Sequence, residues 1–182
     1  DLNADGEINS NDATRDIGYT DIPEYTAGLN TGFSWKNFDF SMQWTGAWNV
    51  DRMLDEFRRP LGDTNEKGLL LYQYDTTWRS SADTFTAKFP RTSSLHASNN
   101  YAGSDLYLIN ASYLRLKSVE IGYNFNFPFM KKLKMDNCRL YVNGYNLITI
   151  TGFKWGDPES RQSSRPNYPL TRVFNIGLKL GF

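Results

Sequence analysis

The feature that most constrains this chain is a period of two that recurs in long segments. Between residues 25 and 35 the odd positions hold Tyr, Ala, Leu, Thr, Phe and Trp, whereas the even positions hold Gly, Thr, Asn and Ser. This alternation predicts a β-strand with one apolar and one polar face. We expect five such strands at about 24–35, 37–49, 112–127, 138–150 and 172–182.

The length of these segments indicates the setting of the strands. Each runs about ten residues or more, which is what a tilted strand needs to cross a bilayer, whereas strands of soluble proteins usually have about five or six. Short turns near residues 36 and 128–136 alternate with long connections at 50–111 and 151–171. Bacterial outer-membrane barrels show this asymmetry, with short periplasmic turns and long external loops. The long connections are therefore expected outside the cell, and the last residue, Phe182, in the periplasm.

Aromatic residues, 15% of the chain, cluster near the two ends of the apolar face. Such an arrangement is typical of the two aromatic girdles of a membrane barrel. The rings concerned are Trp35, Phe38, Phe127 and Phe129 near one end, and Tyr25, Trp44 and Trp48 nearer the other.

The predicted fold class is all-β, an antiparallel transmembrane β-barrel of which the chain supplies five strands. An open sheet in lipid leaves two edges of unpaired backbone groups, each costing several kcal/mol, so membrane sheets must close. We therefore expect these strands to be the carboxyl-terminal part of a longer barrel, or one piece of a closed assembly. The alternative is a secreted β-sandwich that carries a calcium loop and binds carbohydrate.

Two places interrupt the alternation. Residues 114–117 run out of phase, so Arg115 and Lys117 are expected on the face of Val119, at an end that stands above the bilayer in water. In the segment 138–150 the phase blurs after Gly144.

Composition excludes several functions. With 20 basic and 20 acidic residues the formal net charge is +0, which argues against a nucleic-acid partner. A single cysteine, Cys138, permits no intrachain disulfide, and a single histidine, His96, permits no site of several histidines. No phosphate-binding loop, activated nucleophile or isolated catalytic carboxylate pair stands out, so we expect no enzyme activity.

The opening residues "DLNADGEINSND" match the ligand spacing of an EF-hand loop without flanking helices. Calcium is expected to bind the side chains of Asp1, Asn3, Asp5 and Asp12 and the carbonyl of Glu7, with Gly6 at the turn, in a structural role. The alternative is a metal-free surface turn rich in side-chain to backbone hydrogen bonds. Residues 1–23 are expected to form an external loop, and 24–182 the barrel segment.

Almost the whole chain resembles the end of the SusC/RagA family of TonB-linked outer-membrane transporters. The matching stretches are "DLNADGEINSND", "YTAGLNTGFSWKNFDFSMQWTGAW", Trp78 with "AKFPR", "SYLRLKSVEIGYNF", "CRLYVNGYNLITITGFKWGDPE" and the terminal strand with its final Phe182. The stretch "DTTWRSSADTF" departs from the family pattern, in a loop where substrate contacts are expected. The departure therefore bears on the substrate class.

The resemblance implies a 22-stranded barrel around an amino-terminal plug, in the outer membrane of a Gram-negative bacterium. Its five strands here would be numbers 18 to 22. The implied function is TonB-dependent import of oligosaccharides or peptides, powered by TonB, ExbB and ExbD. The implied partner is a SusD-like surface lipoprotein over the external mouth, an arrangement that allows a dimeric transporter–lipoprotein complex. The plug and the TonB-contacting segment would lie upstream of these residues.

Further residues are candidates for particular roles. The last strand resembles the signal read by the outer-membrane assembly machinery, through Phe174, Ile176, Leu178, Leu180 and Phe182. In the long loops, Tyr101, Tyr107, Trp155 and Tyr168 are candidates to stack on substrate, and "DRMLDEFRR" and "EKGLLLYQY" to form short helices. Glu24, Asp39, Gln43 and Glu120 are expected to face the lumen.

Overall fold

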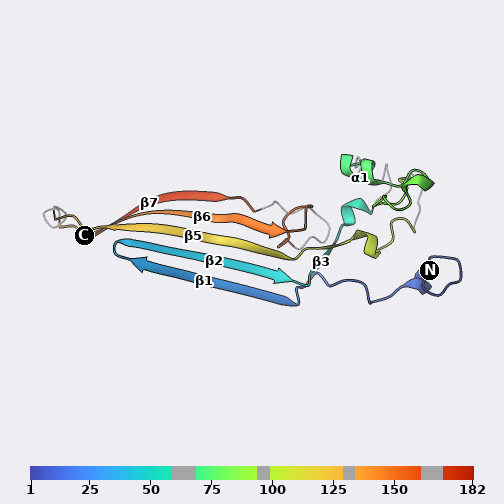
Figure 1. Ribbon diagram of the computed structural model, residues 1–182, viewed down its shortest axis with the longest axis horizontal. Coiled ribbons are helices and arrows are strands. Elements are labelled where there is room, and N and C mark those ends of the chain that lie inside the picture. The colour runs from blue at the N-terminus through green and yellow to red at the C-terminus, as the bar shows by residue number, and fades with distance from the viewer. Residues whose placement is uncertain (59–68, 94–98, 129–133, 161–169) are drawn as a thin grey trace. The chain divides into compact units, whose positions relative to one another are not determined.

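The computed structural model describes residues 1–58, 69–93, 99–128, 134–160 and 170–182 (Figure 1). These residues fall into two compact units. One unit contains the described parts of Ile22–Val50, Ala111–Arg161 and Pro166–Phe182, and the other those of Asp1–Asp21 and Asp51–Asn110. The two units are described in turn.

The first unit is a five-stranded antiparallel sheet (Figure 1). Its strands lie in the order in which the chain passes through them, and each pairs with the next. They are β1 (Tyr25–Trp35), β2 (Phe38–Trp48), β5 (Tyr113–Phe125), β6 (Asn137–Thr151) and β7 (Val173–Gly181). The sheet edges in the described chain are β1 and β7.

The turn between β1 and β2 is as tight as the sequence predicts. Trp35 pairs directly with Phe38, which leaves Lys36 and Asn37 as the two turn residues. Lys36 has a φ of 55°, in the left-handed region that two-residue hairpin turns require. From there the register continues unbroken to the pair of Tyr25 with Trp48.

Register and alternation divide the sheet into two faces. The apolar face has no charged side chain, and many of its large side chains are exposed, including Phe33, Phe174 and Ile176 at 63%, 71% and 73%. The other paired residues of the five strands form the polar face. The apolar face consists of Tyr25, Ala27, Leu29, Thr31, Phe33 and Trp35 of β1; Phe38, Phe40, Met42, Trp44, Gly46 and Trp48 of β2; Leu114, Leu116, Val119, Ile121, Tyr123 and Phe125 of β5; Cys138, Leu140, Val142, Gly144, Ile148 and Ile150 of β6; and Phe174, Ile176, Leu178 and Leu180 of β7.

Aromatic rings lie at both ends of the apolar face. At the Lys36 end, Phe38 meets Tyr123 at 4.7 Å between ring centroids and Tyr123 meets Phe125 at 4.9 Å. Phe125 in turn stacks on Phe127 at 5.3 Å. The residues at the opposite end include the cross-strand pair of Tyr25 and Trp48. Phe129, also expected in the first group, lies outside the described residues.

The expectation that Arg115 and Lys117 share the face of Val119 is wrong. Gln43 of β2 pairs with Ser118, but the next residue, Trp44, pairs with Leu116, so Lys117 is left without a cross-strand partner in a β-bulge. One unpaired residue reverses the alternation beyond it. Leu114 and Leu116 therefore lie on the apolar face and Arg115 on the polar face.

The blurred phase of the fourth segment has the same origin. Opposite the bulge, β6 leaves Asn146 and Leu147 unpaired, and Asn146 has a φ of 53°. Because two residues are skipped, the alternation resumes unchanged at Ile148. The apparent irregularity is confined to the bulge.

The second unit gives the long connection between β2 and β5 a small core of its own. The short strands β3 (Asp51–Met53) and β4 (Leu108–Asn110) pair antiparallel. The 3₁₀ helices are η1 (Ser10–Asp12), η2 (Asp55–Phe57), η3 (Ser81–Asp83) and η4 (Asp105–Tyr107), and the one described α-helix is α1 (Leu71–Thr76). Phe89 lies between Phe57, at 5.1 Å, and Tyr107, at 6.2 Å, and all three are buried.

The short helices expected in this connection form only in part. The first residues of "DRMLDEFRR" pair with β4 and so form strand β3 instead of a helix. The stretch then continues into η2. The described part of "EKGLLLYQY" enters helix α1 at Leu71. The opening residues 1–21 also belong to this unit. Among the described residues, no helix combines the length and apolar character needed to span a membrane.

Candidate functional site

The polar face of the sheet carries a chain of side-chain contacts that crosses four strands. Arg139 of β6 forms an ion pair with Asp39 of β2, to which its Nε donates at 3.0 Å, and its Nη2 donates to Glu120 of β5 at 2.8 Å. Glu120 also accepts from the amide of Asn143 at 3.2 Å. The amide of Asn175 on β7 donates to Asn143 at 2.9 Å. The two carboxylates therefore share one guanidinium, and the contacts reach the edge strand.

Two glycines make room on this face for large side chains of β6. Tyr141 pairs with Gly122 on one side and with Gly177 on the other. A Cβ at Gly177 would overlap the Tyr141 ring, and a Cβ at Gly122 would overlap the Arg139 guanidinium. The guanidinium lies 5.2 Å from the Tyr141 ring centroid. A side chain at Gly177 would displace the Tyr141 ring, whereas one at Gly122 would displace the flexible end of Arg139.

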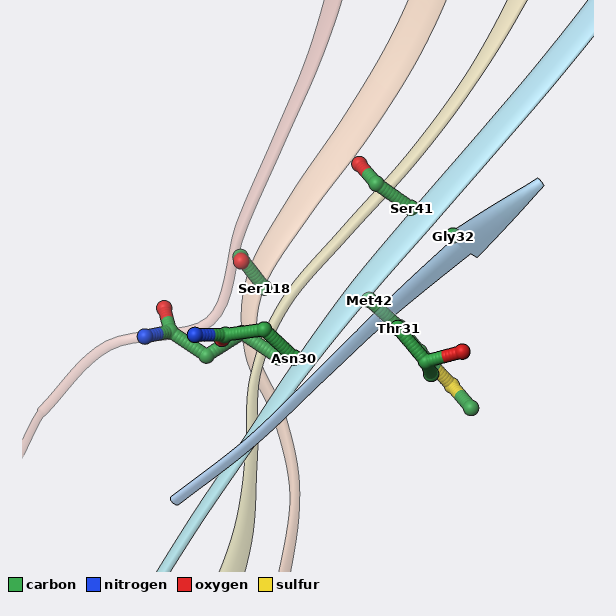
Figure 2. A pocket seen from close by; sticks show the side chains of 7 residues that line it. Asn30, Thr31, Gly32, Ser41, Met42 and Ser118 are labelled. Atoms are coloured by element: carbon green, nitrogen blue, oxygen red, sulfur yellow. The ribbon is translucent and has the colours of Figure 1, made fainter. Parts of the chain in front are cut away.

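Next to this network the polar face is uncharged and forms an open hollow of about 480 Å³ over β1, β2 and β5. Its polar lining includes Asn30, Ser41, Gln43 and Ser118. In Figure 2 the Met42 side chain points away from the side of the strands that carries Ser41 and Ser118, in agreement with its place on the apolar face. The hollow offers amide and hydroxyl groups and no charge.

Beyond the bulge, Arg115 is the centre of a second ionic cluster. Its side chain is buried, with 2% exposed, and donates to Asp157 and to Glu159 at 2.7 Å each. Nε donates to the Thr149 hydroxyl at 3.1 Å. Lys117 adds a weaker contact to Glu159 at 3.3 Å. The cluster joins β5 to the residues that follow β6.

Asp157 also accepts two backbone N–H groups of the β6–β7 connection. Burial disfavours its charge, but the Arg115 guanidinium and the backbone N–H groups of Glu159 and Leu170 outweigh burial and hold the pKa of the carboxyl below its ordinary value. The two N–H groups donate at 2.9 and 3.3 Å. Since Leu170 precedes β7, one carboxylate joins both arms of the β6–β7 connection to β5. Arg115 lies on the face opposite to the one expected, and Asp157 and Glu159 are not among the expected site residues. The signal in the sequence is the contrast between a basic strand end and the acidic "DPE".

In the opening loop, carboxylates accept backbone N–H groups. Asp12 accepts from Leu2 at 2.6 Å and from Asn9 at 2.8 Å, and Asp5 accepts from Glu7 at 2.8 Å. The N–H groups of Asn9 and Leu2 lower the pKa of Asp12, and that of Glu7 lowers the pKa of Asp5. These hydrogen bonds therefore favour the ionised form of both carboxylates.

The expected calcium ligands are oxygen donors, which is the ligand type that calcium prefers. Asp1 accepts the N–H groups of Asp5 at 3.1 Å and of Gly6 at 2.9 Å, and Gly6 has a φ of 87°. The amide nitrogen of Asn3 donates to Asp5 at 2.8 Å. Throughout the described part of the chain, no three His, Cys, Asp or Glu side chains are grouped so that they could hold a metal ion. The donor chemistry fits calcium, whereas the present spacing of the side chains does not assemble a full site.

The aromatic residues proposed for substrate contact differ in accessibility. Tyr107 is only 1% exposed, and its hydroxyl donates to the Asn100 carbonyl at 2.6 Å. Burial raises the pKa of Tyr107 to about 12. Tyr107 therefore belongs to the core of the second unit, and the expectation that it stacks on substrate is wrong. Tyr101 and Trp155 are half-buried, and Tyr168 lies outside the described residues.

The last strand places its candidate assembly residues on the apolar face. Phe174, Ile176, Leu178 and Leu180 are between 44% and 73% exposed, and Phe182 is 81% exposed. Of the residues expected to face the lumen, Asp39, Gln43 and Glu120 lie on the polar face. Glu24 precedes β1 and accepts from the Asn49 amide at 2.9 Å.

The β-sandwich alternative requires a second sheet of comparable strands to cover the apolar face. The described residues form one five-stranded sheet, together with one ladder of two three-residue strands in the other unit. The described residues therefore contain no second sheet that could cover the apolar face as a sandwich requires.

No protein-family model matches the chain. Curated relatives that align with all of it include TonB-dependent receptor P3 of Formosa agariphila, at 30% identity, and TonB-dependent receptor SusC of Bacteroides thetaiotaomicron, at 28%. The chain spans 18% and 17% of their lengths.

Solved structures with the same fold include the RagAB peptide importer in its closed-closed state. That structure covers 98% of this chain at 20% identity with a TM-score of 0.70, and the chain covers 20% of it. The open-open state gives a TM-score of 0.66 over 90% of the chain. The strands described above therefore have the arrangement found in part of a much larger protein.

Proposed function

We propose that this chain, which belongs to the SusC/RagA family of TonB-dependent receptors, forms five neighbouring strands in the wall of an outer-membrane barrel that imports nutrient oligomers. In this proposal the barrel has 22 strands, its apolar face contacts lipid and its polar face lines the interior. The long connections lie outside the cell, and Phe182 lies in the periplasm. The chain's relatives are receptors and transporters and not enzymes.

The observation that carries the proposal is the uncharged, exposed apolar face. In a soluble protein an exposed apolar area of this extent would associate or aggregate, whereas a membrane barrel requires it. Its dimension fits a bilayer. Trp35 and Tyr25 are ten residues apart in β1. At about 3.3 Å per residue and a tilt of about 35–45° they span a depth of roughly 23–27 Å, close to the apolar band of about 25 Å.

The test is whether the whole protein behaves as a closed membrane barrel. We expect it to fractionate with outer membranes, to require detergent for extraction, and to change its mobility in gel electrophoresis on boiling. A protein that stays soluble and monomeric without detergent would refute the membrane assignment.

The proposed import depends on TonB with ExbB and ExbD, and on a SusD-like lipoprotein at the external mouth. Support comes from the curated relatives, which are named TonB-dependent receptors, and from the solved RagAB structures. Uptake of fluorescent peptides and oligosaccharides should require both the protein and TonB. Uptake that persists in cells without TonB would contradict an energised mechanism.

The cargo is proposed to be an oligosaccharide or a peptide. RagAB is described as a peptide importer, which supports the second class. The hollow over β1, β2 and β5 supports cargo without net charge, because its lining contains no charged side chain. Competition of uptake by neutral and by charged oligomers of equal length tests this. Preference for the charged competitor would overturn it.

The end of β7 is proposed to be read during barrel assembly. Phe182 is 81% exposed and follows a strand whose outward residues are all apolar. Deletion of Phe182 should lower the amount of boiling-sensitive, folded protein in the outer membrane, whereas replacement by Tyr, which keeps the ring, should not. Equal amounts for the deletion and the wild type would exclude this role.

Calcium is proposed to bind the opening loop and stiffen it, drawing Asp1, Asn3, Asp5, Glu7 and Asp12 closer together. Support comes from the ionised state of Asp5 and Asp12 and from the positive φ of Gly6. Asp at the twelfth position has one methylene fewer than the usual Glu, so affinity should be modest. Calorimetric titration should show calcium binding that Asp5→Asn abolishes. No heat with millimolar calcium would refute it.

A further inference from the structure

The segment that follows β6 is attached to the polar face through Arg115. Uninterrupted strand alternation would place this residue on the apolar face. Arg115 reaches the polar face only because the unpaired Lys117 reverses the alternation. At 2% exposure its guanidinium is buried, and it donates to Asp157, Glu159 and Thr149. A buried guanidinium is retained only where carboxylates and hydrogen-bond acceptors surround it.

The carboxylates that satisfy Arg115 come from one short segment. Asp157 and Glu159 are two residues apart, and Asp157 also accepts the Glu159 N–H at 2.9 Å, which fixes the turn between them. Asp157 in addition accepts the N–H of Leu170 at 3.3 Å. Phe153, with 5% exposed, packs in the same segment. The buried ion cluster around Arg115 therefore holds the segment against β5.

We propose that Arg115 is a positioning residue that latches the segment 152–160 over the polar face and so narrows the external end of the import path. This inference rests on the proposed function for the statement that the polar face lines the interior. The attachment itself does not depend on it. When Arg115 is absent, Glu159 keeps only the weaker contact with Lys117, and Asp157 is left buried without a counter-charge. A buried carboxylate without a counter-charge is driven toward water. The segment should then swing away and admit larger cargo.

Trypsin reports this attachment directly. Lys154 lies within the latched segment, and cleavage after it requires several residues on each side to leave the fold. In outer-membrane preparations of the whole protein, Arg115→Met should raise the rate of cleavage after Lys154 by at least about tenfold, because a buried charge pair is broken. Cleavage after Arg79, in the other unit, should not change.

A matched control is available in the second ionic cluster of the same face. Arg139 also pairs with two carboxylates, Asp39 and Glu120, but all three lie in strands. Arg139→Met should therefore leave cleavage after Lys154 unchanged. If it raises that cleavage as much as Arg115→Met does, the effect is a general weakening of the sheet and the latch is refuted.

Should Arg115→Met fail to reach the folded, boiling-sensitive form, Glu159→Gln serves in its place. Glu159 is 37% exposed and is the less buried partner, so the variant should fold and raise cleavage severalfold. Unchanged cleavage in a folded Arg115→Met or Glu159→Gln protein overturns the proposal. The import consequence is measured separately, as the largest fluorescent oligomer taken up. A latch that opens in the cleavage assay without a change in that size limit refutes the gating role. A protein that proves soluble refutes the proposed function and leaves the latch testable by the same assay.

Discussion

Met42 and Gln43 provide the sharpest test of the two-faced sheet, because they are neighbours in β2 with unbranched side chains of similar length. Met42 belongs to the apolar face, and Gln43 lines the neutral hollow of the polar face. The change to Arg adds the same charge at both positions. Any difference in free energy between the two variants therefore reports the medium that each side chain meets.

The magnitude follows from the depth of Met42. It lies four residues from Phe38, which is about 13 Å along the strand and roughly 10 Å in depth at a tilt of about 40°. In an apolar band of about 25 Å, this position is close to the midplane, where Arg costs about 2–4 kcal/mol. Met42→Arg should therefore lower the folded-to-unfolded ratio by roughly 30-fold to several hundred-fold. Gln43→Arg should change stability by no more than about 0.5 kcal/mol.

The assay is urea-induced unfolding of the whole protein in lipid vesicles, followed by the boiling-sensitive gel shift. Both variants are compared with the wild type at equal lipid-to-protein ratio. If Met42→Arg costs less than about 1 kcal/mol, the residue does not face the apolar band. If Gln43→Arg costs as much as Met42→Arg, the two faces are not distinct and the barrel assignment is refuted.

Three further predictions follow from single contacts. The pKa of Asp157 is lowered on folding, so its stabilising contribution is complete above the ordinary value of 3.8 and is lost as the pH falls through the lower pKa of the folded protein. The melting-temperature difference between wild type and Asp157→Asn should therefore shrink on acidification below about pH 4. Gly177→Ala should cost about 1–3 kcal/mol in vesicle unfolding, because the added methyl overlaps Tyr141. Gly28→Ala should cost much less, because the nearest heavy atom to its added methyl would be 3.8 Å away. Equal costs would contradict the packing argument. Tyr107→Phe removes a 2.6 Å hydrogen bond from a buried core and should cost about 0.5–1.5 kcal/mol, measured as a lower unfolding midpoint of the second unit. An unchanged midpoint would show that water replaces the bond.

Strand positions and the apolar face could be predicted from the sequence because alternation is a local signal. Each of the five strands in the sheet overlaps a predicted segment, and the Lys36 turn joins the residues expected. Arg115 was assigned to the wrong face because strict alternation was carried through Lys117. Omitting Lys117 from the count places Leu114, Leu116 and Val119 on one face without exception. A sequence that alternates perfectly once a single residue is skipped therefore predicts a bulge.

The second unit was less predictable because its core has no period. Phe57, Phe89 and Tyr107 meet across long stretches of chain, and nothing in their spacing indicates contact. Tyr107 was proposed for substrate contact because a tyrosine in a long loop is usually accessible. The latch escaped prediction for a related reason. Its two halves, Arg115 and Asp157, are far apart in sequence, and their meeting depends on the bulge.

The bulge at Lys117 also affects how the length of strand β5 can change during evolution. In an unbroken membrane strand, gain or loss of one codon turns every later side chain to the opposite face, and charges such as Arg115 would then enter lipid. A residue that already lies outside the ladder can be lost or doubled while both flanking halves keep their orientation. Descendants of this sequence can therefore differ by one residue at this point of β5, whereas β2, which pairs without interruption along β1, is expected to keep its length.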